Sequence, residues 1–295
     1  MGLRSPHHEI ARSLLRSCDP VPIAAPSANK FGHVSPTRSA HVMTDLGDTE
    51  GLLILEDEKR DEEDERDEFT CAIGIESTVC SVSPRGDRVT ILRCGAVGSH
   101  AMRAALLKGG VDGVDVSIKN GLPLDRKDTD TEEPAQGGGE IGATAGAIAP
   151  GQLVRHYAPN VDTFVISSHT RDVLERPSGA DGTHHSHRAT KLLHEGASVV
   201  DFHGQLSGLR RSSSAGKAEG SVDGVYYRDL SPSGDVHEAC RVLFSVLREA
   251  EEAGRTLLLP DLRRVAMVKS SGRQEQEMVR ALWERLLRAA SGEIL

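Results

Sequence analysis

Aromatic residues and long apolar runs are scarce in this sequence. Five Phe, three Tyr and one Trp are all the aromatic residues among 295, too few for the stacking platforms that grip single-stranded nucleic acid. No apolar run approaches the ~18 residues that a membrane span needs. We therefore expect no membrane association and no stable direct binding of nucleic acid.

Cysteine usage excludes another class of protein. The five cysteines form no CxxC pair, their number is odd, and the chain has no N-x-S/T glycosylation sequon. These features argue against a secreted disulfide scaffold and for a reducing compartment. The expected location is the cytoplasm, with an organellar pool left open.

Several catalytic signatures are also absent. The chain has no Walker A loop, no HExxH and no GxSxG, the usual marks of P-loop, zinc-protease and serine-hydrolase chemistry. Residues 137–142 fit GxGxxG, but no strand precedes them, so a linker is favoured over a cofactor loop. The histidines at 184, 185 and 187 lie in a Gly/Asp/Ser context, which favours a solvated tract over a metal site. We expect no metal held by the protein.

Most of the negative charge is concentrated in one run. Residues 56–68 hold ten acidic and three basic side chains, so −7 of the net charge of −9 lies there. A run this charged cannot bury enough surface to offset its ordering entropy. The predicted feature is a solvated insertion over residues 56–70, and the alternative is an acidic binding site.

Strand and helix patterns indicate an α/β protein with two structured blocks. The elements predicted in the first block are helices opening at Ser5-Pro6 and at Ser35-Pro36-Thr37, the latter ending before Gly47, strands over 21–25 and 52–55, and a hairpin over 73–82 and 88–93. Those in the second are strands over 163–166 and 197–202, a helix over 188–196, and amphipathic helices with apolar stripes over 239–250 and 278–289. The expected domains are residues 1–107, a Gly-rich linker over 108–160 that ends in a lid at RHYAP, and a second α/β domain over 161–295. We expect polar insertions in the second domain over 177–187 and 207–221.

The segment PIAAPSANKFGHVSPT, residues 22–37, is suited to hold phosphate. A strand ending in proline leads through small and hydroxyl residues to a capped helix. Backbone N–H groups there, with the hydroxyls of Ser27 and Ser35, can bind phosphate oxygens. The alternative is that Ser35 is only a helix cap and Asn29 only a turn residue.

Two further segments carry unusual polar residues. GIESTVCSV (74–82) has Glu76 and Ser77 in an otherwise apolar strand, and ILRCGAV (91–97) ends its strand with Arg93. A guanidinium in that place can bind a phosphate bidentately, although Arg93 and Glu76 could simply pair with each other. In APGQLVRHYAPN (149–160), two prolines bracket Arg-His-Tyr, a pattern more typical of a lid than of a tether.

Taken in order, these segments closely resemble the threonylcarbamoyl-AMP synthase family, specifically its longer members. Their signatures run approximately as PIAAPSAN…G..SPT, G[VI]ESTV, ILRPG and SPG..YRHYAP, and ALWERLLRAASG (281–292) is similar to the end of their second domain. The resemblance implies a partial YrdC-like twisted α/β sheet domain followed by a smaller Rossmann-like α/β domain.

The resemblance also implies an activity. L-threonine, bicarbonate and ATP would yield threonylcarbamoyl-AMP and pyrophosphate, and the downstream t6A transfer machinery would modify adenosine 37 of tRNA. ATP would be a substrate, accompanied by Mg²⁺. The positions matching ATP contacts are Ser27, Asn29, Ser35, Arg93 and Tyr157, and those matching threonine contacts are Arg4, Ala25 and Ser77. No residue is singled out as catalytic.

The chain departs from the family pattern in three ways. The resemblance begins in the middle of the catalytic domain, so we expect an N-terminally truncated nucleotidyltransferase without the family's Lys-x-Arg signature, with full activity only if the missing segment is present. Cys94 replaces the proline of ILRPG, and the acidic run replaces an Asp-Gly-Gly. The alternative is a non-catalytic nucleotide-binding remnant, or an assembly or regulatory partner in tRNA modification. A carbamoyl transferase of hydrogenase maturation is disfavoured by RHYAP and the tail helices.

Overall fold

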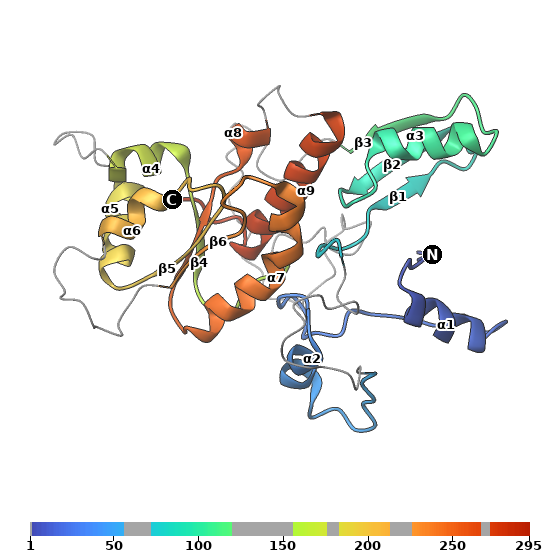
Figure 1. The fold of residues 1–295 in the computed structure, drawn as a ribbon, viewed down its shortest axis with the longest axis horizontal. Coiled ribbons are helices and arrows are strands. Elements are labelled where there is room, and N and C mark those ends of the chain that lie inside the picture. Colours follow the sequence, from blue (N-terminus) through green and yellow to red (C-terminus); the bar gives the residue numbers. More distant parts are fainter. Residues whose placement is uncertain (1, 56–71, 120–155, 176–182, 213–225, 267–271) are drawn as a thin grey trace, which may run out of the picture. The chain divides into compact units, whose positions relative to one another are not determined.

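The chain forms two compact units (Figure 1). A computed structural model describes residues 2–55, 72–119, 156–175, 183–212, 226–266 and 272–295. The first unit comprises Met1–Lys30 and Ser35–Ala72, and the second comprises Phe31–Val34 and Ile73–Leu295. The second unit therefore includes four residues from the middle of the PIAAPSANKFGHVSPT segment. The acidic run, the GxGxxG pattern and most of the predicted linker lie outside the described residues.

The first unit contains two helices, α1 (Glu9–Ser17) and α2 (Ser39–Leu46). Both begin later than predicted: α1 follows His8, and α2 follows Arg38, so Ser35 is not its cap. The backbone N–H of Thr37 donates to Nδ1 of His41 at 3.1 Å, which satisfies that N–H outside the helix.

The predicted strands over 21–25 and 52–55 are wrong. Both segments are irregular, because no strand among the described residues of this unit pairs with them, and a short apolar segment forms a strand only with a partner. The predicted apolar face of α1 exists, but its largest residues are 37–46% exposed. The apolar periodicity therefore identified the helix without identifying a core.

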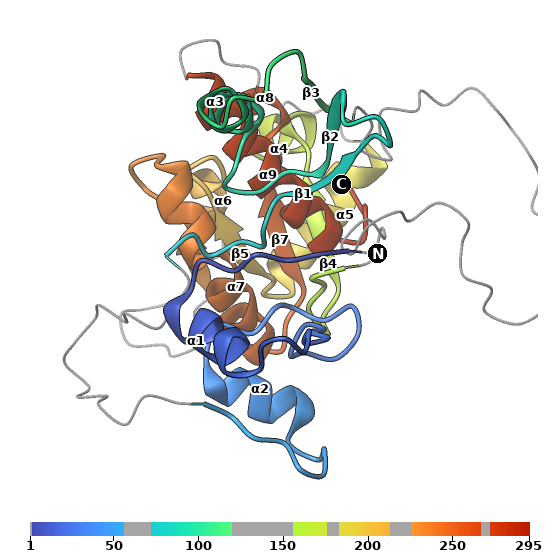
Figure 2. The ribbon, with the colours of Figure 1, turned by 90° about the vertical axis from the view of Figure 1, so that its right-hand side faces the viewer.

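The predicted hairpin is confirmed and belongs to a three-stranded sheet, but its first strand begins at Val79 rather than Ile73, so Glu76 and Ser77 precede the strand. Strand β1 (Val79–Val82) pairs antiparallel with β2 (Arg88–Arg93), and β3 (Asp115–Ile118) pairs parallel with β2 on its other side. Helix α3 (Ser99–Lys108) connects β2 to β3 and lies beside the sheet (Figures 1 and 2). Strand β3 falls inside the range expected to be linker.

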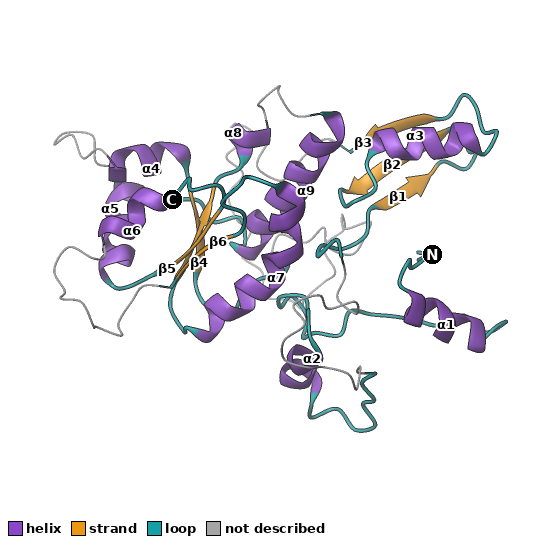
Figure 3. Cartoon of the chain, in the orientation of Figure 1, coloured by secondary structure: helices purple, strands orange, loops and turns teal. Residues whose placement is uncertain are grey.

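The second sheet confirms the predicted α/β class. Its strands are β4 (Thr163–Ile166), β5 (Ser198–Asp201), β6 (Tyr227–Asp229) and β7 (Leu257–Pro260), in the order β4-β7-β5-β6 and all parallel. The helices are α4 (Ser168–Glu175), α5 (His184–His194), α6 (Ser207–Ser212), α7 (Val236–Glu252), α8 (Arg263–Ala266) and α9 (Arg273–Ala289). Figure 3 shows the strands between α4, α5 and α6 on one side and α7 and α9 on the other.

Two predicted polar insertions contain helix. The histidine tract opens α5, where the side chain of Thr183 caps the helix by accepting from the N–H of Ser186. Helix α6 likewise lies within the range 207–221. Caps and short helices of this kind leave little trace in apolar periodicity.

The alternation of side chains along the strands divides the core in two. Leu257 and Leu259 of β7 face α7 and α9, whereas Leu258 faces the other layer with residues of α5 and α6. The first cluster also contains Ile75, Ile91 and Tyr157, which come from the motif segments of the first sheet and the linker. One apolar interior therefore serves both sheets of the second unit.

No helix in the described part of the chain is both long enough and apolar enough to span a lipid bilayer.

Candidate functional site

Arg93 occupies the centre of the candidate site, at the end of β2. Its side chain is buried, and its Nε and Nη2 atoms donate to the backbone carbonyl of Ser77 at 3.2 and 2.8 Å. Its Nη1 donates to the hydroxyl of Tyr157 at 3.1 Å. Arg93 thus links the GIESTV and RHYAP segments, and the structure brings together three of the predicted binding residues.

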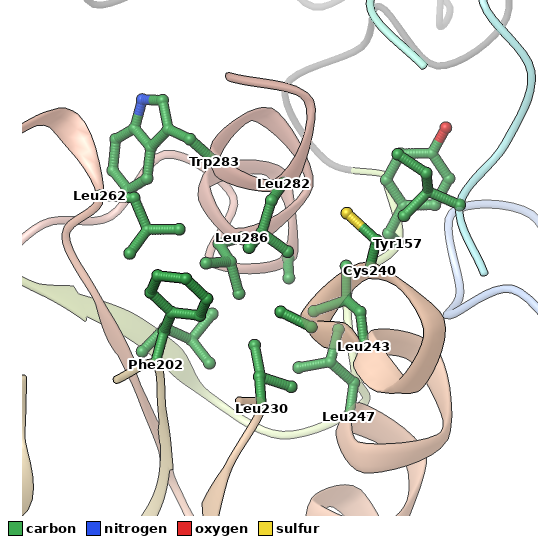
Figure 4. Packing of buried hydrophobic residues seen from close by; sticks show 14 of the residues in the cluster. Tyr157, Phe202, Leu230, Cys240, Leu243, Leu247, Leu262, Leu282, Trp283 and Leu286 are labelled. Atoms are coloured by element: carbon green, nitrogen blue, oxygen red, sulfur yellow. The ribbon is translucent and has the colours of Figure 1, made fainter. Parts of the chain in front are cut away.

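Tyr157 differs from the expected lid residue. Its ring is 1% exposed and packs on Phe244 of α7, with ring centres 5.4 Å apart. Figure 4 shows the ring beside Cys240 and the hydroxyl pointing away from the apolar cluster. Its φ of +63° lies in the left-handed region, an unfavourable conformation for a non-glycine residue that the surrounding contacts must hold in place. The segment is therefore anchored at Tyr157 rather than extended.

A second guanidinium, on α9 of the second domain, holds the GIESTV and ILRCG segments. Arg285 of α9 donates through Nε to a carboxylate oxygen of Glu76 at 3.2 Å and through Nη1 to the carbonyl of Cys94 at 2.6 Å. Burial raises the pKa of the Cys94 thiol to about 12, so the residue that replaces the family's proline is a neutral thiol there.

At two glycines of the motifs, the backbone of another segment lies too close for any side chain. A Cβ on Gly95 would lie 2.5 Å from the backbone nitrogen of Thr78, and one on Gly74 would lie 2.2 Å from the Cα of Arg241. Real side chains do not tolerate such distances, so only glycine fits either position. Gly95 seats the ILRCG segment on GIESTV, and Gly74 seats GIESTV on α7.

Positive charge accumulates around these residues. Burial is the main cause of a lowered pKa at Arg288, and nearby Arg285 and Arg93 lower it further, against the opposite effects of Glu284 and Tyr157. His156 has a lowered pKa as well, chiefly through burial, with the same arginines acting in that direction and Glu76 against it. A cluster with more guanidinium than carboxylate charge favours an anionic ligand.

The FGHV residues meet the YAPN residues on α7. The carboxylate of Glu251 contacts Nε2 of His33 at 2.8 Å and accepts from the backbone N–H of Asn160 at 2.9 Å. The N–H of Ala158 donates to the carbonyl of Gly32 at 2.9 Å. This connection places the end of the linker against residues 32–33 of the PIAAPSANKFGHVSPT segment.

The Glu251 contacts predict a pH dependence of stability. Burial raises the pKa of Glu251, but hydrogen bonds from His33 and Asn160 outweigh it and hold the pKa below its usual value. A depressed folded-state pKa stabilises the protein above the unfolded pKa, and that contribution is lost as pH falls through the folded pKa. We expect Glu251→Gln to be destabilising at pH 7, and its difference from the wild type to shrink between about pH 5 and pH 3.

Urea titrations at a series of pH values measure this difference. Glu252→Gln, an exposed neighbour on the same helix, is the control and should follow the wild type throughout. A destabilisation by Glu251→Gln that stays constant across the acid range would contradict the assignment.

The other predicted binding residues lie in the first unit. Arg4, Ala25 and Ser27 are exposed, and Asn29 donates through its side chain to the carbonyl of Lys30 at 2.9 Å. Ser35 is half-buried and precedes α2 by several residues, which removes the predicted helix-start geometry. Their roles toward ATP and threonine stay predictions.

Sequence reasoning missed the partners that come from the second domain. Arg285 falls on the stripe of Met278, Leu282 and Ala289 in α9, so a charged residue on an apolar face was the available signal. His33 and Asn160 stand inside segments already singled out. Nothing in a single sequence indicates that Glu251 joins them.

The described residues offer no group of three or more His, Cys, Asp or Glu side chains that could hold a metal ion. The carboxylate of Glu76, which precedes Ser77 in sequence, is paired with Arg285 at 3.2 Å. That Mg²⁺ accompanies the nucleotide stays a prediction.

Comparison with known proteins gives this arrangement a family. The model described as "Threonylcarbamoyl-AMP synthase, C-terminal domain" matches residues 117–291, more than half of the chain. The chain belongs to the threonylcarbamoyl-AMP synthase family. A second model, described as "Telomere recombination", matches residues 1–95. The family predicted from the ordered motifs is thereby confirmed.

Curated relatives carry the name threonylcarbamoyl-AMP synthase. The one from Pyrococcus abyssi is 27% identical over 300 residues, which cover all of this chain and 65% of the relative. The one from Bacillus subtilis is 31% identical over 54% of this chain and 34% of the relative, and the one from Schizosaccharomyces pombe 27% over 57% and 33%. The chain thus spans less than two thirds of the length of these synthases.

A solved structure is also similar. It is a doubly substituted P. abyssi Sua5, 22% identical, with a TM-score of 0.45, and the match covers 99% of this chain and 62% of that one.

Proposed function

We propose that this chain binds ATP and L-threonine and takes part in making threonylcarbamoyl-AMP for the t6A modification of tRNA. The observation that carries the proposal is the joining of Arg93, the Ser77 carbonyl and the Tyr157 hydroxyl. Arg93 and Tyr157 match ATP contacts and Ser77 matches a threonine contact of the family. Family membership and the relatives' names support the same chemistry.

The reaction needs alignment and charge neutralisation more than covalent help. An oxygen of the threonine carbamate attacks the α-phosphorus of ATP. The bond between the α-phosphorus and the bridging oxygen breaks, and pyrophosphate leaves with that electron pair. The guanidinium of Arg93, with Arg288 close to Tyr157, would oppose the growing charge. Anchored rather than loose, the Tyr157 hydroxyl would present a fixed polar atom to the nucleotide.

Replacing Tyr157 by Phe tests the nucleotide assignment. The variant keeps the buried ring and removes only the hydroxyl, so the folded fraction should be unchanged. Loss of one neutral hydrogen bond should weaken ATP binding by about 3- to 10-fold in isothermal titration with Mg²⁺ present. Tyr226→Phe is the matched control, because the Tyr226 hydroxyl donates to Glu249 in the second domain, away from the predicted site residues in sequence.

The same titrations decide between the two candidate roles. Binding of ATP and threonine together with threonine-dependent pyrophosphate release supports the synthase. Binding without turnover favours the nucleotide-binding remnant or regulatory partner. Wild-type ATP affinity in Tyr157→Phe would refute the role given to the hydroxyl.

A further inference from the structure

Helix α9 of the second domain contacts the first sheet through two buried ionisable residues. Arg285 is 1% exposed, and Glu277 accepts from the N–H of Ser99, at the start of α3, at 2.6 Å. A buried guanidinium is costly to desolvate and needs several good acceptors. The positions of the acceptors of Arg285 therefore show which segments this side chain holds in place.

Three of these acceptors lie in the two motif segments. They are the carboxylate of Glu76 at 3.2 Å, the carbonyl of Glu76 at 3.4 Å and the carbonyl of Cys94 at 2.6 Å. A fourth, the carbonyl of Ala281 at 3.1 Å, is one turn back on α9 itself. The guanidinium of Arg285 thus spans both motifs, and the Nη1 atom that reaches Cys94 also donates to its own helix.

The contacts of Arg285 alternate with those of Arg93. Arg285 donates hydrogen bonds to residues 76 and 94, and Arg93 donates to Ser77, which follows residue 76, and to Tyr157. Between them, Gly95 lies against the backbone of residues 76–78, and the Thr78 hydroxyl donates to the carbonyl of Val97 at 2.8 Å. A shift of either segment would break contacts to both guanidiniums.

We propose that Arg285 is a positioning residue for the site: from the second domain, it sets the register between the GIESTV and ILRCG segments and so the placement of Ser77 and Arg93. The consequence for the reaction rests on the function proposed above. This gives the second domain a task, which is to supply the cation that holds the binding motifs of the first sheet together.

The planar fork is essential to this role. A lysine keeps the charge but offers a point donor on a flexible stem, so it cannot reach Glu76 and Cys94 at once. The comparison is therefore Arg285→Lys against Arg280→Lys. Arg280 is on the same helix, pairs with Glu284 at 3.2 Å and donates to the carbonyl of Lys119 at 3.2 Å, but within the described part of the chain it makes no hydrogen bond to either motif segment. Its replacement therefore controls for the change of residue type in α9.

Two measurements on the full chain test the proposal. Hydrogen exchange without ligands should be at least about fivefold faster in Arg285→Lys for peptides covering 74–78 and 93–97, and unchanged in Arg280→Lys. In threonine-dependent pyrophosphate release, the KM for threonine should rise about tenfold with kcat changed less than about threefold. A purely structural role would instead lower the active fraction, and thus kcat, at constant KM.

The outcomes separate this inference from the proposed function. A wild type without threonine-dependent turnover defeats the proposed synthase, and the exchange measurement still decides whether Arg285 holds the two segments. An active wild type with an unchanged threonine KM in Arg285→Lys overturns the positioning role while the function stands. Unchanged exchange in that variant overturns it in either case.

Discussion

Replacing Arg93 by Ala is expected to reduce threonine-dependent pyrophosphate release by at least about a hundredfold, the usual cost of removing a charge-stabilising donor from a site. The guanidinium contacts both the Ser77 carbonyl and the Tyr157 hydroxyl. Its removal takes away the proposed phosphate contact and also the link between two segments. Both losses act on the same reaction, which is why the effect is large.

The control lies on the same strand. Arg88 of β2 is 65% exposed and 4.0 Å from Asp115, so Arg88→Ala removes an equal charge where no ligand is proposed and should leave turnover unchanged. Arg93→Lys should recover only part of the activity, because lysine cannot bind bidentately. Turnover by a folded Arg93→Ala variant at the wild-type rate would defeat the site assignment.

Gly74→Ala is expected to lower the free energy of unfolding by on the order of 3 kcal/mol. The new methyl group would lie 2.2 Å from both the Cα of Arg241 and the carbonyl oxygen of Cys240. These are backbone atoms of α7, which cannot move aside without displacing the core that the helix covers. The φ of +79° adds the strain of a left-handed alanine.

The two causes can be separated with Gly110→Ala. Gly110 has nearly the same φ, +74°, and no atom within 4 Å of the position where its Cβ would be. That variant should show the backbone cost alone, about 1 kcal/mol. Urea titrations of both proteins measure the difference. Equal losses at the two positions would mean that the helix yields and that the contact with α7 is unimportant.

Local patterns predicted the second domain better than the first unit. Strand β4 was predictable because a short continuous apolar run is typical of a buried strand, and α7 and α9 were predictable because their apolar residues recur with helical periodicity. The segments over 21–25 and 52–55 have the same apolar character, but a strand also needs a neighbour, and pairing is not written in the segment itself. The same limit applies to Ser35, whose helix starts later because the choice of cap depends on flanking contacts.

The motif residues of the site could be predicted from the sequence, but the residues of the second domain that hold the motifs in place could not. Ser77, Arg93 and Tyr157 stand in short segments with unusual polar residues. Arg285 and Glu251 come from helices that read as ordinary core or surface, and their partners are more than ninety positions away. Pairings at that separation depend on how the sheets pack, which one sequence does not disclose.

The apolar interior shared by the two sheets also constrains how this protein can change. Tyr157 lies on Phe244, and Gly74 lies against the backbone of α7, so a bulkier residue on that face of the helix would be felt in both motif segments. A substitution on α7 therefore requires a compensating substitution in the motif segments. If second domains were exchanged between distant relatives, the surface of α7 would therefore no longer be complementary to the motif segments that pack on it.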